Sequence, residues 1–447
     1  MTRIYEDMAY SDRPIQDRYW DSTLDAELPV YPALDGDASC DFAIIGGGYT
    51  GLSAALTLVE AGADVILLDA KRPGWGASGR NGGLVSAGMS KLSDDTIEAT
   101  YGAADARLFY DAERAAVDLV RDYIDRYALN VDRHSDGYSC VAHSPAALDG
   151  LKAYGESYTR RYGLPYQLIA PQEMENHGMA SPDFHGGVHL PMGFALNPLK
   201  FLVGLTRAAA AAGVMMHSDT PVLKVLQDGG FHLKTPTGTV RARKVLFATN
   251  GYGSDHLPRP LGAHYLPVQS NILVSRPLSE VELQTQGWTS RQMVVDSRTL
   301  LHYFRLLPDN RMLLGLRGSV RVSEDNIART RARARTDFDR MFPAWRHVET
   351  PYFWSGLICM TRALVPFAGP VPGMEGAFAA FGYHGSGLTG APYGGALIAD
   401  LALGRNSADR PHPAFMQAAP RRFELGRYRR ASLPPAFAWY RLKDRLS

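Results

Sequence analysis

A chain of 447 residues with 45% hydrophobic residues is long enough to bury a large core in about two domains. Its 47 basic and 46 acidic residues leave a net charge of +1, which argues against a nucleic-acid-binding protein. Three distant cysteines, Cys40, Cys140 and Cys359, without a C-x-x-C pair predict buried thiols and no metal site. No secretory leader is visible and no stretch reaches about 18 apolar residues, so we expect a cytoplasmic protein without a transmembrane segment.

Residues 1–37 form a polar, proline-containing arm that we expect to pack on the outside. The apolar run Cys40–Ile45 then leads directly into the glycine-rich run Gly46-Gly47-Gly48-Tyr49-Thr50-Gly51. In this G-x-G-x-x-G pattern the first glycine allows a tight turn, the second a close approach of a pyrophosphate, and the third close packing of the next helix. The pattern predicts a bound dinucleotide.

Apolar residues at helical spacing follow, from Leu52 to Val59, and Gly62 ends the predicted helix. The buried run Val65–Leu68 reads as a parallel strand, with Asp69 and Ala70 at its end. An acid about 20 residues after the glycines is placed to bind a ribose hydroxyl.

A second glycine-rich loop carries one arginine and lies at residues 74–83. Its backbone is suited to wrap an extended cofactor, Arg80 to meet phosphate, and Ser78 and Asn81 to donate neutral hydrogen bonds. The alternative is an ordinary surface loop.

Further along, residues 105–127 place apolar side chains on one helical face, and Asn197-Pro198 begins another helix that stops at Gly213. Residues 214–250 read as short strands with turns at 228–230 and 236–238, closed by the buried strand Lys244–Thr249.

Residues 256–352 predict mostly antiparallel strands and a charged helix at 326–341. In the alternating run 300–306, His302 and Phe304 share one face while Tyr303 and Arg305 share the other. Tyr303 and Arg305 are candidates for holding a substrate carboxylate, and His302 for assisting proton removal. The alternative for both Arg305 and His302 is a structural role.

Residues 378–390 are a strand, a glycine-rich turn and a small-residue helix, in which Gly385, Gly387 and Gly390 formally repeat G-x-G-x-x-G. No strand ending in an acid follows, so a second nucleotide site is rejected. The last segment, residues 411–447, is a basic amphipathic tail.

These motifs, with Ala248–Tyr252, Gly382–Gly387 and both chain ends, resemble the D-amino-acid oxidase (DAO) superfamily of FAD enzymes, and most of all its gamma-glutamylputrescine oxidase-like branch. The resemblance implies an α/β fold, α+β overall, with a Rossmann-like FAD-binding domain and an inserted, mostly antiparallel substrate domain. The expected domains are the arm at 1–37, a discontinuous FAD-binding domain at 38–130, 195–255 and 353–410, a substrate-binding domain at 131–194 and 256–352, and the tail at 411–447.

By the same resemblance, Val222 binds adenine through its backbone and the 385–389 turn aims amides at the pyrimidine end of the flavin. The residues that we expect to bind FAD are Gly46, Gly48, Tyr49, Thr50, Gly51, Asp69, Ala70, Gly76, Ala77, Ser78, Arg80, Asn81, Gly82, Gly83, Val222, Ala248, Thr249, Gly251, Gly385, Ser386, Gly387, Leu388 and Thr389.

The chain departs from the family in this turn. His384 and Ser386 stand in the reverse of the branch's usual order, and Thr389 replaces the lysine of sarcosine-oxidase relatives. His384 is a further candidate catalytic residue. Cys359 lies several residues out of register with the cysteine that attaches FAD covalently in some relatives, so we expect noncovalent FAD.

The resemblance implies oxidation of an aliphatic amine or amino acid: hydride passes from the alpha carbon to flavin, the imine hydrolyses, and O2 is reduced to hydrogen peroxide. A gamma-glutamylated polyamine and a secondary amino acid are the substrates considered. One alternative is a dehydrogenase that passes electrons to quinone or a protein, and another is a noncatalytic flavin-binding redox sensor. The sequence leaves the oligomeric state open.

Overall fold

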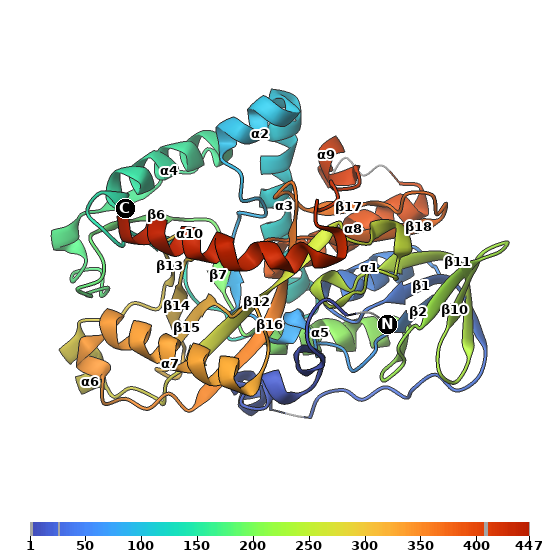
Figure 1. The fold of residues 1–447 in the computed structure, drawn as a ribbon, viewed down its shortest axis with the longest axis horizontal. Coiled ribbons are helices and arrows are strands. Elements are labelled where there is room, and N and C mark those ends of the chain that lie inside the picture. The colour runs from blue at the N-terminus through green and yellow to red at the C-terminus, as the bar shows by residue number, and fades with distance from the viewer. Residues whose placement is uncertain (1–2, 26, 406–409, 447) are drawn as a thin grey trace.

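Two eight-stranded sheets organise the computed structural model, which describes residues 3–25, 27–405 and 410–446 (Figure 1). The predicted arm, the third FAD-domain segment and the tail therefore each include a few residues outside the described ranges, namely 1–2, 26, 406–409 and 447.

The first sheet is centred on β1 (Ala38–Ile45), which pairs in parallel with β2 (Val65–Leu68) and β11 (Thr239–Phe247). Its order is β17-β18-β11-β1-β2-β8, with the hairpin β9–β10 attached to β11. The other strands are β8 (Met215–His217), β9 (Lys224–Gln227), β10 (Phe231–Lys234), β17 (Phe367–Pro370) and β18 (Ala377–Phe381). The predicted strands and both predicted turns between residues 214 and 250 are confirmed.

Four helices pack together against this sheet in one apolar core: α1 (Tyr49–Glu60), α3 (Ala103–Arg126), α5 (Pro198–Ala211) and α8 (Gly387–Leu403). Asn197 caps α5 as predicted, because its side chain accepts hydrogen bonds from the Leu199 and Lys200 amides.

The second sheet is mostly antiparallel, in the order β16-β12-β15-β14-β13-β4-β6-β5. Its strands are β4 (Tyr138–Val141), β5 (Gln167–Ile169), β6 (Gly187–Leu190), β12 (Tyr265–Val274), β13 (Met293–Asp296), β14 (Tyr303–Leu306), β15 (Met312–Arg317) and β16 (Tyr352–Thr361). The predicted boundary at residue 353 falls inside β16, which pairs with β12 along its whole length. Helix α7 (Glu324–Met341) covers one face through Ala334, Phe338 and Met341.

Smaller elements connect the two sheets. The strands β3 (Leu84–Val85) and β7 (Phe194–Ala195) form a short ladder. The remaining helices are α2 (Asp94–Tyr101), α4 (Ala147–Tyr162), α6 (Glu280–Gln286), α9 (Ala414–Gln417) and α10 (Leu433–Leu446), and the 3-10 turns lie at 7–10, 13–15, 19–23, 77–79, 171–173, 250–252, 259–261, 343–345 and 426–432. Helices α2 and α4, which line the upper edge of the molecule in Figure 1, were not predicted.

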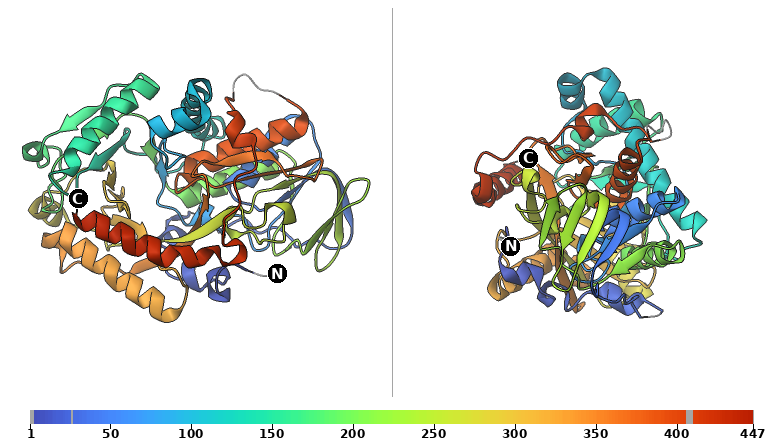
Figure 2. Two further views of the ribbon diagram at one scale, coloured as in Figure 1. Left: turned by 45° about the horizontal axis from the view of Figure 1, so that its top comes forward. Right: turned by 90° about the vertical axis from the view of Figure 1, so that its right-hand side faces the viewer.

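The C-terminal segment packs on this framework through α10 (Leu433–Leu446). The predicted tail contains α10, which crosses the front of the molecule near α7 (Figure 2) and buries Leu433 and Phe437 against β12. Its outward side leaves Trp439 63% exposed. At its far end the Asp444 carboxylate accepts hydrogen bonds from the Thr299 and Leu300 amides.

Within the described ranges, no helix has the length and apolarity needed to cross a bilayer. In the same part of the chain, no group of three or more His, Cys, Asp or Glu side chains is arranged to hold a metal ion.

We expect the substitution Gly51→Ala to prevent α1 from packing on the first sheet, and so to prevent folding of that part of the chain. A Cβ on residue 51 would overlap the Gly46 carbonyl oxygen beneath α1. Gly150→Ala in α4 is the matched control, since a Cβ there meets nothing within 4 Å. Soluble yield and the flavin-to-protein absorbance ratio measure the outcome. Normal flavin content in Gly51→Ala would contradict the packing described.

Candidate functional site

The turn after β1 is shaped for close approach of backbone on two sides. Gly46 has a φ of +112°, and a Cβ there would lie 2.8 Å from the Ala248 carbonyl oxygen. A Cβ on Gly48 would lie 2.8 Å from the Ser78 hydroxyl, which itself accepts a hydrogen bond from the Tyr49 amide at 3.0 Å. The N-terminus of α1 and the loop at residue 78 therefore face one another as the two sides of a cradle.

Asp69 lies at the end of β2, as predicted, and its carboxylate organises this turn. It accepts hydrogen bonds from the Gly47 amide at 2.7 Å and the Lys71 amide at 2.8 Å, and burial raises its pKa. The Thr220 amide donates to the Asp69 carbonyl at 2.8 Å, which brings the segment leading to Val222 beside the same strand end. The predicted ribose and adenine positions are thus neighbours.

Arg80 has a different setting from the one that we expected. Its guanidinium donates to the Trp75 and Ser355 carbonyls and stacks 4.3 Å from the Trp75 ring centroid. Nη2 is buried with no hydrogen-bond partner among the described residues, and Arg80 lines the cavity described below. One donor of the predicted phosphate-binding fork is therefore left for a ligand.

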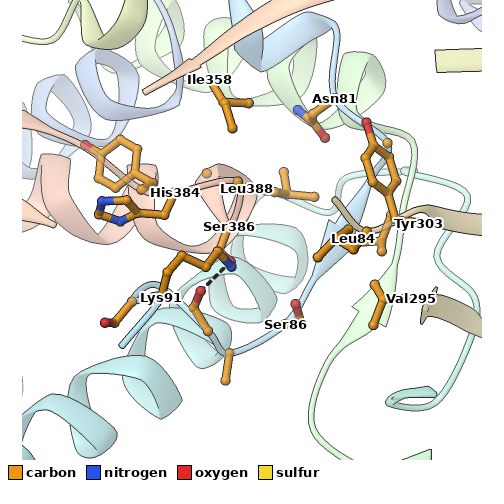
Figure 3. A pocket seen from close by; sticks show the side chains of 18 of the residues that line it. Asn81, Leu84, Ser86, Lys91, Val295, Tyr303, Ile358, His384, Ser386 and Leu388 are labelled. Atoms are coloured by element: carbon orange, nitrogen blue, oxygen red, sulfur yellow. Dashed lines mark hydrogen bonds between the residues drawn. The ribbon is translucent and has the colours of Figure 1, made fainter. Parts of the chain in front are cut away.

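The glycine-rich turn that leads into α8 contacts the segment at residues 86–88, which follows the glycine-rich loop at residues 74–83. Ser386 donates to the Gly88 carbonyl at 2.7 Å (Figure 3), and the Thr389 hydroxyl accepts from the Ser86 amide at 3.1 Å. Thr50 is buried and its hydroxyl is hydrogen-bonded to Tyr383 at 2.9 Å, so its side chain packs α1 onto this turn.

These loops open into one large cavity of ≈ 760 Å³. It begins at Tyr49 and Ser78, passes the start of α8, and ends against the second sheet and α4. Figure 3 shows Ser386, Leu388 and Lys91 on one side of it and Tyr303, Leu84 and Val295 on the other. A single space thus joins the dinucleotide turn to the second sheet, as a cofactor and a substrate in contact require.

The predicted cofactor residues divide by position. Those that line the cavity are Tyr49, Ala77, Ser78, Arg80, Asn81, Gly82, Gly385, Ser386, Gly387 and Leu388. Those that form the surrounding turns and strand ends are Gly46, Gly48, Thr50, Gly51, Asp69, Ala70, Gly76, Gly83, Val222, Ala248, Thr249, Gly251 and Thr389.

Tyr303 and His384 are the two predicted catalytic residues that line the cavity. Tyr303 packs on Gly315, and its hydroxyl lies 3.3 Å from that of Ser270. His384 is 1% exposed; Nδ1 donates to the Met89 carbonyl at 3.0 Å, so Nε2 accepts from the Thr361 amide at 3.1 Å. Burial lowers the pKa of His384 to about 3. It is therefore a neutral imidazole with both nitrogens engaged by backbone.

Arg305 does not line the cavity. It is 1% exposed and donates to the Gly82 carbonyl at 2.9 Å, the Leu196 carbonyl at 2.7 Å and His134 Nε2 at 2.9 Å. This arrangement supports the structural alternative over substrate binding, because the guanidinium is occupied in joining the glycine-rich loop to the second sheet.

His302 also lies outside the cavity, immediately before β14. Its ring nitrogens contact the Asp296 carboxylate at 2.7 Å and the Asp337 carboxylate at 3.3 Å. Burial opposes the charged form, but the two carboxylates outweigh it and raise the pKa of His302 to about 9. A buried imidazolium between two acids supports the structural alternative here too.

The sequence analysis did not identify two charged residues that line the cavity, Lys91 and Arg317. Lys91 follows β3 and Arg317 ends β15, and both line the cavity. Lys91 is exposed to the open cavity, and its enclosure there together with the charge of Arg317 lowers its pKa to about 8, while burial lowers the pKa of Arg317. Neither stands in a recognised motif, so only the pairing of distant strands could have brought them together.

Cys359 borders the same cavity, and burial raises the pKa of its thiol well above the ordinary value. A thiol held protonated is a poor nucleophile.

The residues present fit FAD. A pyrophosphate would fit between Gly48 and Ser78 because glycine leaves that space open, Asp69 retains lone pairs for ribose hydroxyls, and the buried Arg80 Nη2 lacks an acceptor among the described residues.

Comparison with known proteins agrees with this arrangement. A sequence profile described as "DAO: FAD dependent oxidoreductase" matches residues 41–401. The probable oxidoreductase OrdL of Rhizobium meliloti is 33% identical over 440 residues, covering 97% of this chain and 99% of that one. Gamma-glutamylputrescine oxidoreductase of Escherichia coli is 31% identical over 425 residues, covering 93% and 95%. The solved structure of glycine oxidase from Geobacillus kaustophilus has a TM-score of 0.70 at 22% identity, covering 86% of this chain and 100% of that one.

We expect the stabilising effect of His302 to depend on pH. Its folded pKa of about 9 exceeds the usual 6.5, so its stabilisation is complete below pH 6.5 and is lost as pH rises through 9. The difference in unfolding free energy between wild type and His302→Gln should shrink by about 3 kcal/mol between pH 6 and 9.5. Urea unfolding with saturating FAD measures this, with His232→Gln on β10 as control. A difference independent of pH would contradict a buried imidazolium.

The Cys359 thiol gives a second prediction. We expect FAD to be released into the supernatant by acid precipitation of the wild type, and Cys359→Ala to keep a full complement of flavin, because a buried, protonated thiol does not alkylate. Flavin that stays in the acid precipitate of wild type and is lost from that of Cys359→Ala would show a covalent bond.

Proposed function

Because this chain belongs to the DAO family of FAD-dependent oxidoreductases, which act on amines and amino acids, we propose that it is an oxidase of an aliphatic amine or amino acid with O2 as electron acceptor. The observation that carries the proposal is the single cavity that runs from the α1 turn past the start of α8 to the second sheet. The relation to gamma-glutamylputrescine oxidoreductase over 93% of this chain supports a gamma-glutamylated amine as substrate.

Three parts of the chain would hold FAD. The α1 N-terminus and Ser78 face the pyrophosphate, Asp69 the ribose, and the α8 N-terminus, after Ser386, the flavin ring. When bound, FAD would supply the acceptor for the hydride that leaves the alpha carbon as the carbon–nitrogen single bond becomes an imine.

The remaining task of the chain is to align the amine and exclude water. The wall opposite α8 is formed by Tyr303, Ile272 and Val295, which present an aromatic ring and aliphatic surface to the substrate. On the α8 side of the cavity, His384 is neutral and both of its ring nitrogens are hydrogen-bonded to the backbone, so it supplies shape there and no proton. Positioning and desolvation are sufficient for the oxidation of a neutral amine.

Anaerobic titration of the purified holoenzyme tests the proposal. We expect gamma-glutamylputrescine to bleach the visible flavin absorbance, and air to restore it with one hydrogen peroxide formed per flavin. Putrescine, sarcosine, proline and D-amino acids are compared in the same way. Bleaching that air does not reverse would identify a dehydrogenase with another acceptor, and a flavin that no amine reduces would favour the noncatalytic alternative.

A further inference from the structure

Helix α10 has two apolar sides. Leu433 and Phe437 are buried against β12. Leu442 follows Leu433 by nine residues, which is about two and a half helical turns, so it lies on the opposite side of the helix. Trp439 stands three residues before Leu442, and these two side chains are 63% and 48% exposed. Packing within the described chain therefore accounts for only one of the two apolar sides.

The second side of α10 faces away from the rest of the molecule. The helix runs along the front in Figure 1 and lies at the outer edge in the right-hand view of Figure 2. Asp444 agrees with this orientation, because it follows Leu433 by eleven residues, about three turns, and accepts the backbone amides of residues 299–300 on the protein side. Trp439 and Leu442 are thus open to a partner from outside.

The exposed aromatic side chains of the described residues all lie in this C-terminal segment. They are Tyr428, Trp439 and Tyr440, and the exposed aliphatic residues Leu425 and Leu442 lie in the same segment. Tyrosine and tryptophan are enriched where an apolar and an aqueous phase meet, because each has an apolar ring and a polar O–H or N–H. This composition is typical of a surface that enters a membrane interface.

The same segment is strongly basic, although the whole chain carries a net charge of only +1. Residues 421–447 contain eight basic and two acidic residues. Both acids are engaged, since Glu424 pairs with two arginines and Asp444 binds backbone amides. Lys443 stands four residues after Trp439, and so beside the outward apolar side.

Two of the basic residues are turned inward, where Arg429 pairs with Asp255 and Arg430 with Glu6. The basic side chains of this segment that are exposed are Arg421, Arg422, Arg427, Arg441 and Lys443. The surface therefore complements a partner that is both apolar and anionic.

A second copy of the chain fits these requirements less well than a membrane does. In a twofold dimer the same surface faces itself, which places its cations opposite their own copies. A bilayer that contains anionic phospholipid accepts aromatic and aliphatic side chains in its interface and attracts cations to its head groups. A helix that lies in the plane of the interface does not need the length of a spanning helix.

We propose that the outward side of α10, with the exposed residues of the preceding segment 421–432, binds the surface of an anionic phospholipid bilayer. Trp439 and Leu442 enter the interface, and the surrounding cations contact the head groups. Membrane binding is independent of the proposed function, because none of these residues lines the cavity.

Sedimentation of the holoenzyme with vesicles tests this surface. We expect binding to phosphatidylcholine vesicles that contain about one-third phosphatidylglycerol, little binding to pure phosphatidylcholine, and loss of binding as salt is raised. Trp439→Ser combined with Leu442→Ser, and separately Lys443→Glu, should each weaken vesicle binding about ten-fold or more. Val281→Ser on α6 and Lys224→Glu on β9 change exposed residues elsewhere and are the matched controls.

Tryptophan fluorescence gives an independent readout. Trp439 is the exposed one of the six tryptophans, and the other five are buried, so acrylamide quenching reports on Trp439. We expect anionic vesicles to shield it from acrylamide. Trp439→Phe should abolish this vesicle-dependent change and keep membrane binding, because an aromatic ring is retained.

Each variant should keep the flavin content and the thermal unfolding temperature of the wild type, because the packed side of α10 is unchanged. Wild type that fails to sediment with anionic vesicles, or that binds neutral ones equally, would overturn the proposal. Undiminished vesicle binding by the Trp439→Ser, Leu442→Ser double variant would do the same. If no vesicle binds and light scattering detects a dimer that this double variant loses, the surface belongs to a second copy of the chain.

Discussion

The site depends on buried guanidinium groups that donate to backbone carbonyls of one glycine-rich loop. Arg18 donates to Gly79, Arg80 to Trp75, and Arg305 to Gly82. A loop rich in glycine loses much conformational entropy on ordering, and these charge-assisted hydrogen bonds offset that cost. Because the arginines come from the arm, the loop itself and the second sheet, fixing the loop also fixes how the two domains meet.

This constraint couples the cofactor and substrate sides of the cavity. The same continuous segment presents the Ser78 hydroxyl to α1 and, thirteen residues later, Lys91 to the cavity near the start of α8. Between them, buried Glu113 accepts the Gly88 and Met89 amides and so fixes the path of the chain toward Lys91. A change that loosens the loop would therefore disturb both the α1 end of the cavity and the end that Lys91 lines.

Motifs formed by residues close in sequence predicted the fold well. They predicted the roles of side chains in the second sheet poorly. The turn at Gly46–Gly51 and Asp69 is specified by residues close in sequence, so its geometry follows from composition and spacing. Alternation along β14 correctly placed Tyr303 and Arg305 on one face, and both contact Gly82, but only Tyr303 also reaches the cavity. Nothing within residues 300–306 reveals which of the two will line the cavity. Helix α4, by contrast, shows helical spacing at Leu151, Tyr154, Tyr158 and Tyr162 and could have been found.

Lys91 shows why the role of a residue cannot be transferred by sequence position alone. The chain has Thr389 where sarcosine-oxidase relatives carry lysine, and Thr389 is occupied in accepting the Ser86 amide. A positive charge nevertheless reaches the start of α8, because the side chain of Lys91 extends to it. Lys91 lies in the segment that follows Ser86, whose amide donates to Thr389. The hydrogen bond of the substituting threonine thus helps to position the segment that supplies the cation.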